Sequence, residues 1–165
     1  EPNRQGLGEL VFEVMSLVED DLADLRQVCG PVGDECVVRD DDRARVRAAR
    51  AGEEAAYWFL RESGWTMVAR NYRPEGLRGE IDLIGWDGGT LVFVEVKTRS
   101  RTELQTPEAA VDRDKQRHVR AAARQYLHQA RQEQSPWRFD IVSVDMDGAS
   151  SEQPPKMNHL RDAFR

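Results

Sequence analysis

The segment from Thr90 to Thr98 constrains the fold most, because it is apolar on both sides of a strand before it becomes charged. Alternate side chains of a strand share a face. Apolar residues therefore occupy both faces over residues 91–94, and Glu95 and Lys97 then follow on one of those faces. A strand with two apolar faces needs a covering layer on each side. We therefore predict an α/β fold in which helices pack on a sheet.

Helical and strand-like patterns alternate along residues 43–165. The predicted elements are a helix over residues 43–63, strands over Trp65–Tyr72, Glu80–Trp86 and Thr90–Thr98, a helix over about Pro107–Gln132, and a strand over Arg138–Asp145. Gly64 is the expected C-terminal cap of the first helix. Short glycine-containing links favour an antiparallel meander for the three consecutive strands. The helix before the last strand predicts a crossover to a parallel strand.

Acidic residues are concentrated near the N-terminus of this 165-residue chain, whose formal net charge is −6. Residues 1–42 hold 12 acidic and 3 basic side chains, whereas residues 43–165 hold 18 acidic and 21 basic ones. Apolar residues recur every three or four positions from Val11 to Cys29, which predicts an amphipathic acidic helix followed by a linker. We therefore expect an N-terminal extension, residues 1–42, and a main domain, residues 43–165. We expect the extension to pack on the main domain or on a second copy of the chain. The alternatives are that it masks a basic nucleic-acid surface or binds a partner.

Composition excludes several classes of protein. The longest apolar run, Ala55–Leu60, is far shorter than a membrane span, and no basic patch precedes an apolar stretch at the start of the chain. We therefore expect a cytoplasmic protein with no membrane partner. Cys29 and Cys36 are the only cysteines, which excludes a disulfide framework and a four-cysteine zinc site. The three histidines lack metal-ligand spacing and are expected at the surface or satisfied in the core.

Two carboxylates are expected to converge on neighbouring strands. Asp82 stands between Ile81 and Leu83 in the second predicted strand, and Glu95 lies in the third. If these strands are neighbours, about 4.8 Å apart, the carboxylates come within reach of one ion. Two converging carboxylates repel each other, and a divalent cation relieves that repulsion. Because oxygen ligands select hard cations, the predicted cofactor is Mg²⁺ or Mn²⁺, held by Asp82 and Glu95.

Such a site suits phosphodiester hydrolysis, since Mg²⁺ keeps waters for the phosphate and the nucleophile. Lys97 is predicted to orient or help deprotonate the attacking water and to offset charge on the phosphate oxygens. A solvated Glu-x-Lys pair on an exposed strand is the alternative. Glu53 lies within the apolar face of the first predicted helix, so its carboxylate points toward the packing partner or reaches water at the margin of that face.

Arginines follow one side of the second predicted helix and the end of the third predicted strand. They are Arg113, Arg117, Arg120, Arg124 and Arg131 on the helix, and Arg99 and Arg101 after the strand. The planar guanidinium group suits phosphate, so these residues are predicted to follow a DNA backbone. A solvated basic face is the alternative. No base-reading element is visible, and binding is expected to depend on salt and shape more than on sequence.

Many of these residues form a pattern that strongly resembles the YraN family. The pattern is Gly52-Glu53, Gly64, Asn71, Gly79-Glu80-Ile81-Asp82-Leu83-Ile84, Phe93-Val94-Glu95-Val96-Lys97-Thr98-Arg99, Lys115, Arg138-Phe139-Asp140 and His159-Leu160. It covers about residues 43–165 and leaves out the N-terminal extension. The resemblance implies a restriction-endonuclease-like core, ordered helix, three strands, helix, strand, similar to archaeal Holliday-junction resolvases.

The same resemblance implies that Asp82, Glu95 and Lys97 form a nuclease triad and that Glu53 joins the metal site. Resolvases of similar fold act as dimers, which implies a homodimer. We therefore expect a metal-dependent endonuclease that acts on DNA and prefers structured DNA. The alternatives are a nucleic-acid-binding accessory protein with little or no turnover, and a protein-interaction module that uses the acidic helix. Asp140, in the last predicted strand, is expected to pair with an arginine.

Overall fold

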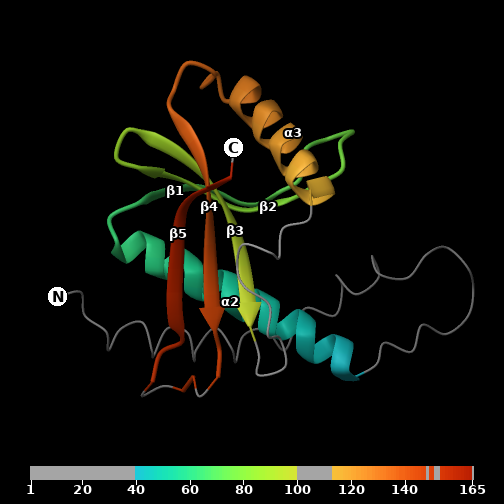
Figure 1. Cartoon of the computed structure of the whole chain (residues 1–165), viewed down its shortest axis with the longest axis vertical. Helices are drawn as coiled ribbons and strands as arrows, with labels where there is room; N and C mark the ends of the chain where they lie inside the picture. Colours follow the sequence, from blue (N-terminus) through green and yellow to red (C-terminus); the bar gives the residue numbers. More distant parts are fainter. Residues whose placement is uncertain (1–39, 100–112, 148, 151–152, 165) are drawn as a thin grey trace, which may run out of the picture.

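The described part of the chain folds into two helices and five strands (Figure 1). The computed structural model describes residues 40–99, 113–147, 149–150 and 153–164. The elements are α2 (Asp40–Glu62), β1 (Thr66–Tyr72), β2 (Ile81–Asp87), β3 (Thr90–Arg99), α3 (Arg113–Gln129), β4 (Trp137–Asp145) and β5 (Lys156–Phe164). The predicted acidic helix lies outside the described residues. Neither of the two described helices is long and apolar enough to cross a membrane.

The five strands form one mixed sheet in the order β1-β2-β3-β4-β5. β1, β2 and β3 pair antiparallel, which confirms the predicted meander. β3 and β4 pair parallel across the connection that contains α3, as predicted, and β5 pairs antiparallel with β4. The predicted α/β class is therefore confirmed.

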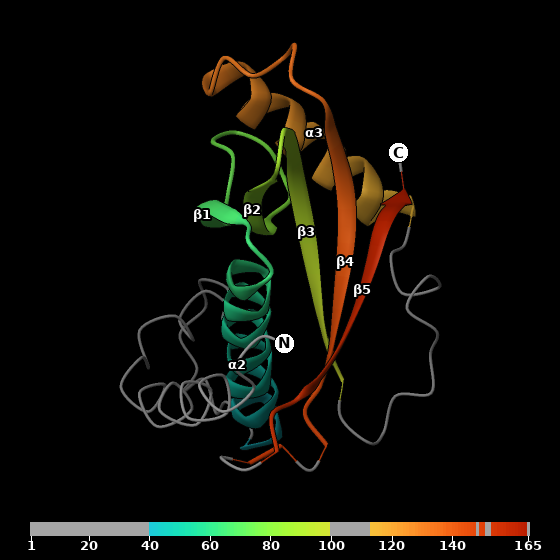
Figure 2. The same ribbon diagram turned by 90° about the vertical axis from the view of Figure 1, so that its left-hand side faces the viewer.

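The two helices cover opposite faces of this sheet (Figure 2). Val92, Val94 and Val96 of β3 belong to a buried cluster with residues of α2. Leu91 and Phe93, which alternate with them, belong to a second buried cluster with residues of α3. The two-sided apolar pattern of β3 therefore reflects a central strand with a helix on each side.

After each of the two described helices, a residue with a left-handed backbone conformation ends the helical path. Gly64 has a φ of 91°, and the Trp65 N–H donates to the carbonyl of Leu60, which confirms the predicted glycine cap. Arg131 has a φ of 54°, and the Gln132 N–H donates to the carbonyl of Leu127 in the same arrangement. α3 therefore ends at Gln129, before the predicted Gln132, because a non-glycine residue caps it. α2 begins at Asp40, earlier than the predicted Arg43.

The sequence patterns do not predict β5. Its sequence, from Lys156 to Phe164, is mostly polar, and its exposure does not alternate regularly. β5 is an edge strand held by its antiparallel pairing with β4. In this pairing His159 lies opposite Val142, and Met157 lies opposite Val144. An edge strand with few buried side chains carries a weak period-two pattern, so this element was not visible locally.

Candidate active site

β2 and β3 bring Asp82 and Glu95 to one place. The described ladder pairs Leu83 with Val94, and Asp82 and Glu95 are the next residues on the two strands. The backbone N–H of Val96 donates a hydrogen bond of 2.7 Å to Oδ2 of Asp82, which ties Asp82 to β3 beside Glu95. Glu95 is 5% exposed. The two carboxylates therefore lie on neighbouring strands and are close enough to interact electrostatically.

α2 brings Glu53 toward the same region because Gly52 allows the helix to approach β3 closely. A Cβ at Gly52 would lie 1.9 Å from Oγ1 of Thr98, so no larger residue fits without a shift. Glu53 is partly buried. Its side chain hydrogen-bonds that of Asn71 on β1, which has a φ of 48°.

The three carboxyl groups repel one another in a partly dry environment. Burial raises the pKa of Asp82, and the negative charges of Glu95 and Glu53 raise it further. The Val96 N–H and the Lys115 ammonium act in the opposite direction, and the resulting pKa is about 7. Burial also raises the pKa of Glu53. The site therefore holds more negative charge than the folded protein stabilises, which is typical of functional sites.

Two lysines contact the same oxygen of Glu95. Lys97 Nζ lies 2.8 Å from Glu95 Oε1. Lys115 Nζ, from the first turn of α3, forms a second ion pair with that oxygen. Burial lowers the pKa of Lys115, but its contacts with Glu95 outweigh this effect and leave its pKa above the ordinary value. Glu95 of this pair is buried and Lys97 is partly buried, so the pair differs from a fully solvated Glu-x-Lys pair.

The donor atoms fit a hard divalent cation held by two carboxylates. Asp82 accepts a hydrogen bond through Oδ2, and Glu95 forms its two ion pairs through Oε1. One or two carboxylates with several waters are typical of Mg²⁺ sites. In residues 40–99 and the later described segments, no three His, Cys, Asp or Glu side chains are arranged to hold a metal. Glu53 therefore acts on Asp82 through charge, and its role as a ligand stays a prediction.

The predicted nucleic-acid-binding arginines are only partly described. Arg117 and Arg124 lie on the exposed side of α3, and Arg117 pairs with Asp114 at 3.2 Å. The guanidinium group of Arg120 lies 5.7 Å from the ring centre of Phe164. Arg99 is partly buried at the end of β3. Arg101 and the side chain of Arg113 lie outside the described residues.

The sequence patterns predict no role for three residues near the site, Lys115, Asn71 and Ser143. Lys115 and Asn71 stood in the family-like pattern, but nothing local linked them to the strands. Ser143 of β4 lies opposite Lys97 in the parallel register. Its buried hydroxyl has no hydrogen-bond partner in the described part of the chain. Each of these residues lies beside a residue of an element that is distant in sequence. Only the strand register and the helix packing of the folded chain show that they are neighbours.

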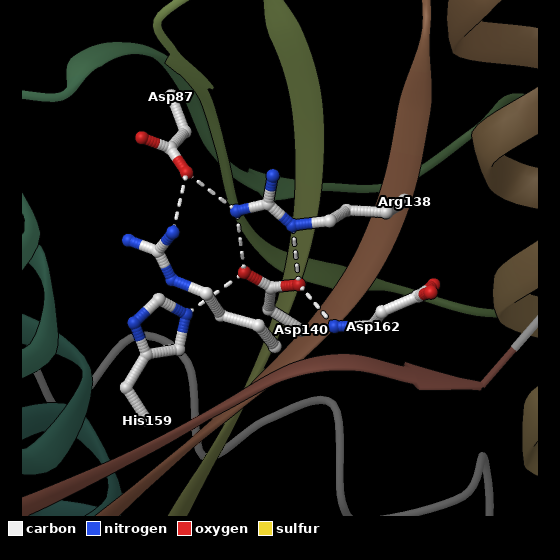
Figure 3. Close-up of polar contacts among 6 residues, drawn as sticks. Asp87, Arg138, Asp140, His159 and Asp162 are labelled. Carbon is white, nitrogen blue, oxygen red and sulfur yellow. Dashed lines mark hydrogen bonds and ion pairs between the residues drawn. The ribbon is translucent and has the colours of Figure 1, made fainter.

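A second buried polar cluster lies around Asp140 (Figure 3). Asp140 is fully buried and accepts hydrogen bonds from Arg138 Nε at 2.9 Å, His159 Nε2 at 2.8 Å and the Asp162 N–H at 2.9 Å. Arg138 also donates to Asp87 at 2.7 Å. Burial acts to raise the pKa of Asp140, but these hydrogen bonds outweigh it and keep the pKa below its ordinary value. This confirms the predicted arginine pair and a satisfied His159.

Comparison with known proteins identifies relatives of the whole site region. The model of an uncharacterised protein family, UPF0102, matches residues 52–144. A UPF0102 protein of Koribacter versatilis is 46% identical over 124 residues, which cover 75% of this chain and 83% of that protein. A UPF0102 protein of Solibacter usitatus is 48% identical over 128 residues, which cover 74% of this chain and 93% of that protein. The chain therefore belongs to the UPF0102 family, the YraN family that its motifs resemble.

Proposed function

We propose that this protein is a metal-dependent endonuclease that hydrolyses phosphodiester bonds in DNA. The observation that carries the proposal is the meeting of Asp82, Glu95 and Lys97 where β2 and β3 lie side by side. Burial, together with repulsion by the neighbouring carboxylates, raises the pKa of Asp82 to about 7. A protein that needed only stability would replace such a cluster by neutral side chains. A site that binds a divalent cation uses the same charges for function.

In the proposed mechanism, Asp82 and Glu95 are the residues that would hold Mg²⁺ or Mn²⁺. The bound ion supplies Lewis-acid chemistry toward a phosphate oxygen and a water. Lys97, whose Nζ lies 2.8 Å from Glu95 Oε1, would orient the attacking water and stabilise the charge that develops on the phosphate oxygens.

The order helix, three strands, helix, strand supports a restriction-endonuclease-like core, to which β5 adds an edge strand. α3 supports DNA as the substrate, because its first turn reaches the site through Lys115 and its outer side carries Arg117 and Arg124. Arginines contact phosphates without reading bases, so we propose recognition of DNA shape, with branched DNA as the preferred form and a homodimer as the acting species.

A catalytically weak accessory protein that binds nucleic acid is the second candidate. Two observations favour it. Two ammonium groups already pair with Glu95, and no three metal-binding side chains are preassembled in the described residues. Such a protein would use the same arginines to hold DNA and would release it intact.

A cleavage assay separates these candidates. Labelled four-way junction, linear duplex and single-stranded DNA are incubated with wild type, Asp82→Asn, Lys97→Met and the control Lys156→Met, in Mg²⁺, Mn²⁺ or EDTA. We expect cleavage with metal by wild type and Lys156→Met, and a loss of about 10²-fold or more in the other two variants. Salt-sensitive binding without cleavage would support the accessory role. Absence of both binding and cleavage would reject a DNA function.

A further inference from the structure

Lysine is scarce in this chain, and its placement is uneven. Of 24 basic residues, only Lys97, Lys115 and Lys156 are lysines. Two of these three meet on a single buried oxygen, Oε1 of Glu95. A compact ammonium group makes one point contact, whereas a guanidinium group holds a carboxylate through two parallel bonds and is harder to displace. The lysines at this position therefore suit a contact that is made and released.

The two lysines differ in how firmly they are held. Lys97 projects from β3, whose backbone pairs with β4 at that residue, and its side chain is 23% exposed. Lys115 projects from the first turn of α3, and its side chain is 46% exposed. Lys115 therefore has an open path to solvent, and Lys97 is the more enclosed of the pair.

The charge balance of the site changes when a divalent ion enters. Without an ion, Glu53, Asp82 and Glu95 face the ammonium groups of Lys97 and Lys115. An ion bound to Asp82 and Glu95 adds two positive charges beside both ammonium groups, and like charges at such short range repel strongly. The less enclosed ammonium group, Lys115, is the one that relieves this repulsion by moving away.

We propose that Lys115 is a positioning residue that serves as the resident counter-cation of Glu95. It holds the Glu95 carboxylate in place through the ion pair while the metal is absent, and it releases Glu95 to solvent when a divalent cation binds. The inference rests on the proposed metal site. In this exchange, the divalent cation replaces the ammonium group of Lys115 at Glu95, and Lys97 stays in contact with Glu95.

The first test measures Mn²⁺ affinity of the full chain by calorimetry, without DNA. Removing a competing unit charge at this range changes ion affinity by about tenfold even under water-like screening. We therefore expect Lys115→Met to bind Mn²⁺ about tenfold more tightly than wild type. Lys156→Met removes the same charge from an exposed position at the start of β5 and is expected to bind like wild type. Equal or weaker binding by Lys115→Met would overturn the inference.

The second test uses wild-type protein, so it does not depend on the folding of a variant. An amine-reactive reagent labels the lysines, and mass spectrometry reads each of the three separately. We expect labelling of Lys115 to rise severalfold on addition of Mn²⁺, with Lys156 as the internal reference that stays constant. Unchanged labelling of Lys115 in protein that binds Mn²⁺ would overturn the release of Glu95. Absence of Mn²⁺ binding to wild type would overturn the metal site itself, and the inference with it.

Discussion

Asp82 lowers the stability of the protein when no metal is bound. Its pKa is about 7, above the ordinary value near 3.8, because the carboxyl group is buried and close to Glu95 and Glu53. A raised carboxyl pKa means that its contribution to stability is fully present below about pH 4 and is lost as pH rises through about 7. The ionised form of Asp82 therefore costs folding free energy at pH 8.

Asp82→Asn is expected to stabilise the metal-free protein at pH 8. The amide keeps an oxygen for the Val96 N–H but carries no charge, so the free energy of unfolding should rise by about 2–4 kcal/mol. Urea unfolding in EDTA at pH 8 and pH 4 measures the effect, which should vanish at pH 4. The exposed Asp114→Asn serves as the control and should change little at either pH. A less stable Asp82→Asn protein at pH 8 would contradict the account of the carboxylate cluster.

Asp140 has the opposite role, because its charge is fully satisfied. Its lowered pKa means that it stabilises the fold above pH 4 and that this contribution is lost as pH falls through the folded-state pKa. Asp140→Asn leaves Arg138 without its buried charge partner, so we expect a loss of about 3 kcal/mol at pH 7. Urea unfolding at pH 7 and pH 3 would show the difference from wild type shrinking at the lower pH. A pH-independent difference would argue against the ionised network of Figure 3.

At the scale of elements, the contact between α2 and β3 depends on Gly52. A methyl group there would overlap Oγ1 of Thr98, so Gly52→Ala should lower the free energy of unfolding by about 1–3 kcal/mol. Because Glu53 is the next residue, the same substitution should displace it from Asn71. Gly89→Ala is the matched control, since a Cβ at Gly89 meets nothing within 4 Å. Thermal unfolding of the two variants measures the effect, and equal stability would disprove close packing at Gly52.

The outer side of α3 is expected to bind DNA phosphates. Arg117→Ala and Arg124→Ala should each weaken binding to all DNA sequences alike and reduce the slope of log affinity against log salt by about 1. Fluorescence anisotropy with a junction and a linear duplex at several salt concentrations measures both quantities. An unchanged salt slope in both variants would assign these arginines to a solvated surface.

The sequence predicts well the elements that have a buried face of their own. β3 and α2 carry clear apolar patterns, and Gly64 ends α2 as a glycine cap should. β5 and the end of α3 could not be predicted in the same way. β5 is a polar edge strand defined by its pairing, and Arg131 takes a left-handed conformation that its residue type does not signal.

At the scale of the whole molecule, the parts of the site differ in how far the sequence reveals them. Asp82 and Glu95 could be predicted to meet, because two neighbouring strands joined by a short turn fix their register. The contact between Lys115 and Glu95 could not, since it depends on how α3 packs after a crossover. The opposing layers α2 and α3 each deliver one group to the site, Glu53 and Lys115, and only the complete fold sets their distance from Glu95.

The central claim is that Asp82 and Glu95 together hold a divalent cation. Anomalous diffraction from crystals of the full chain soaked in Mn²⁺ tests it most directly, since the ion's position is seen without reference to activity. The account predicts a manganese peak within about 2.0–2.3 Å of one oxygen from each of these two carboxylates. A peak elsewhere, or no peak with both side chains ordered and Lys115 still on Glu95, would contradict it.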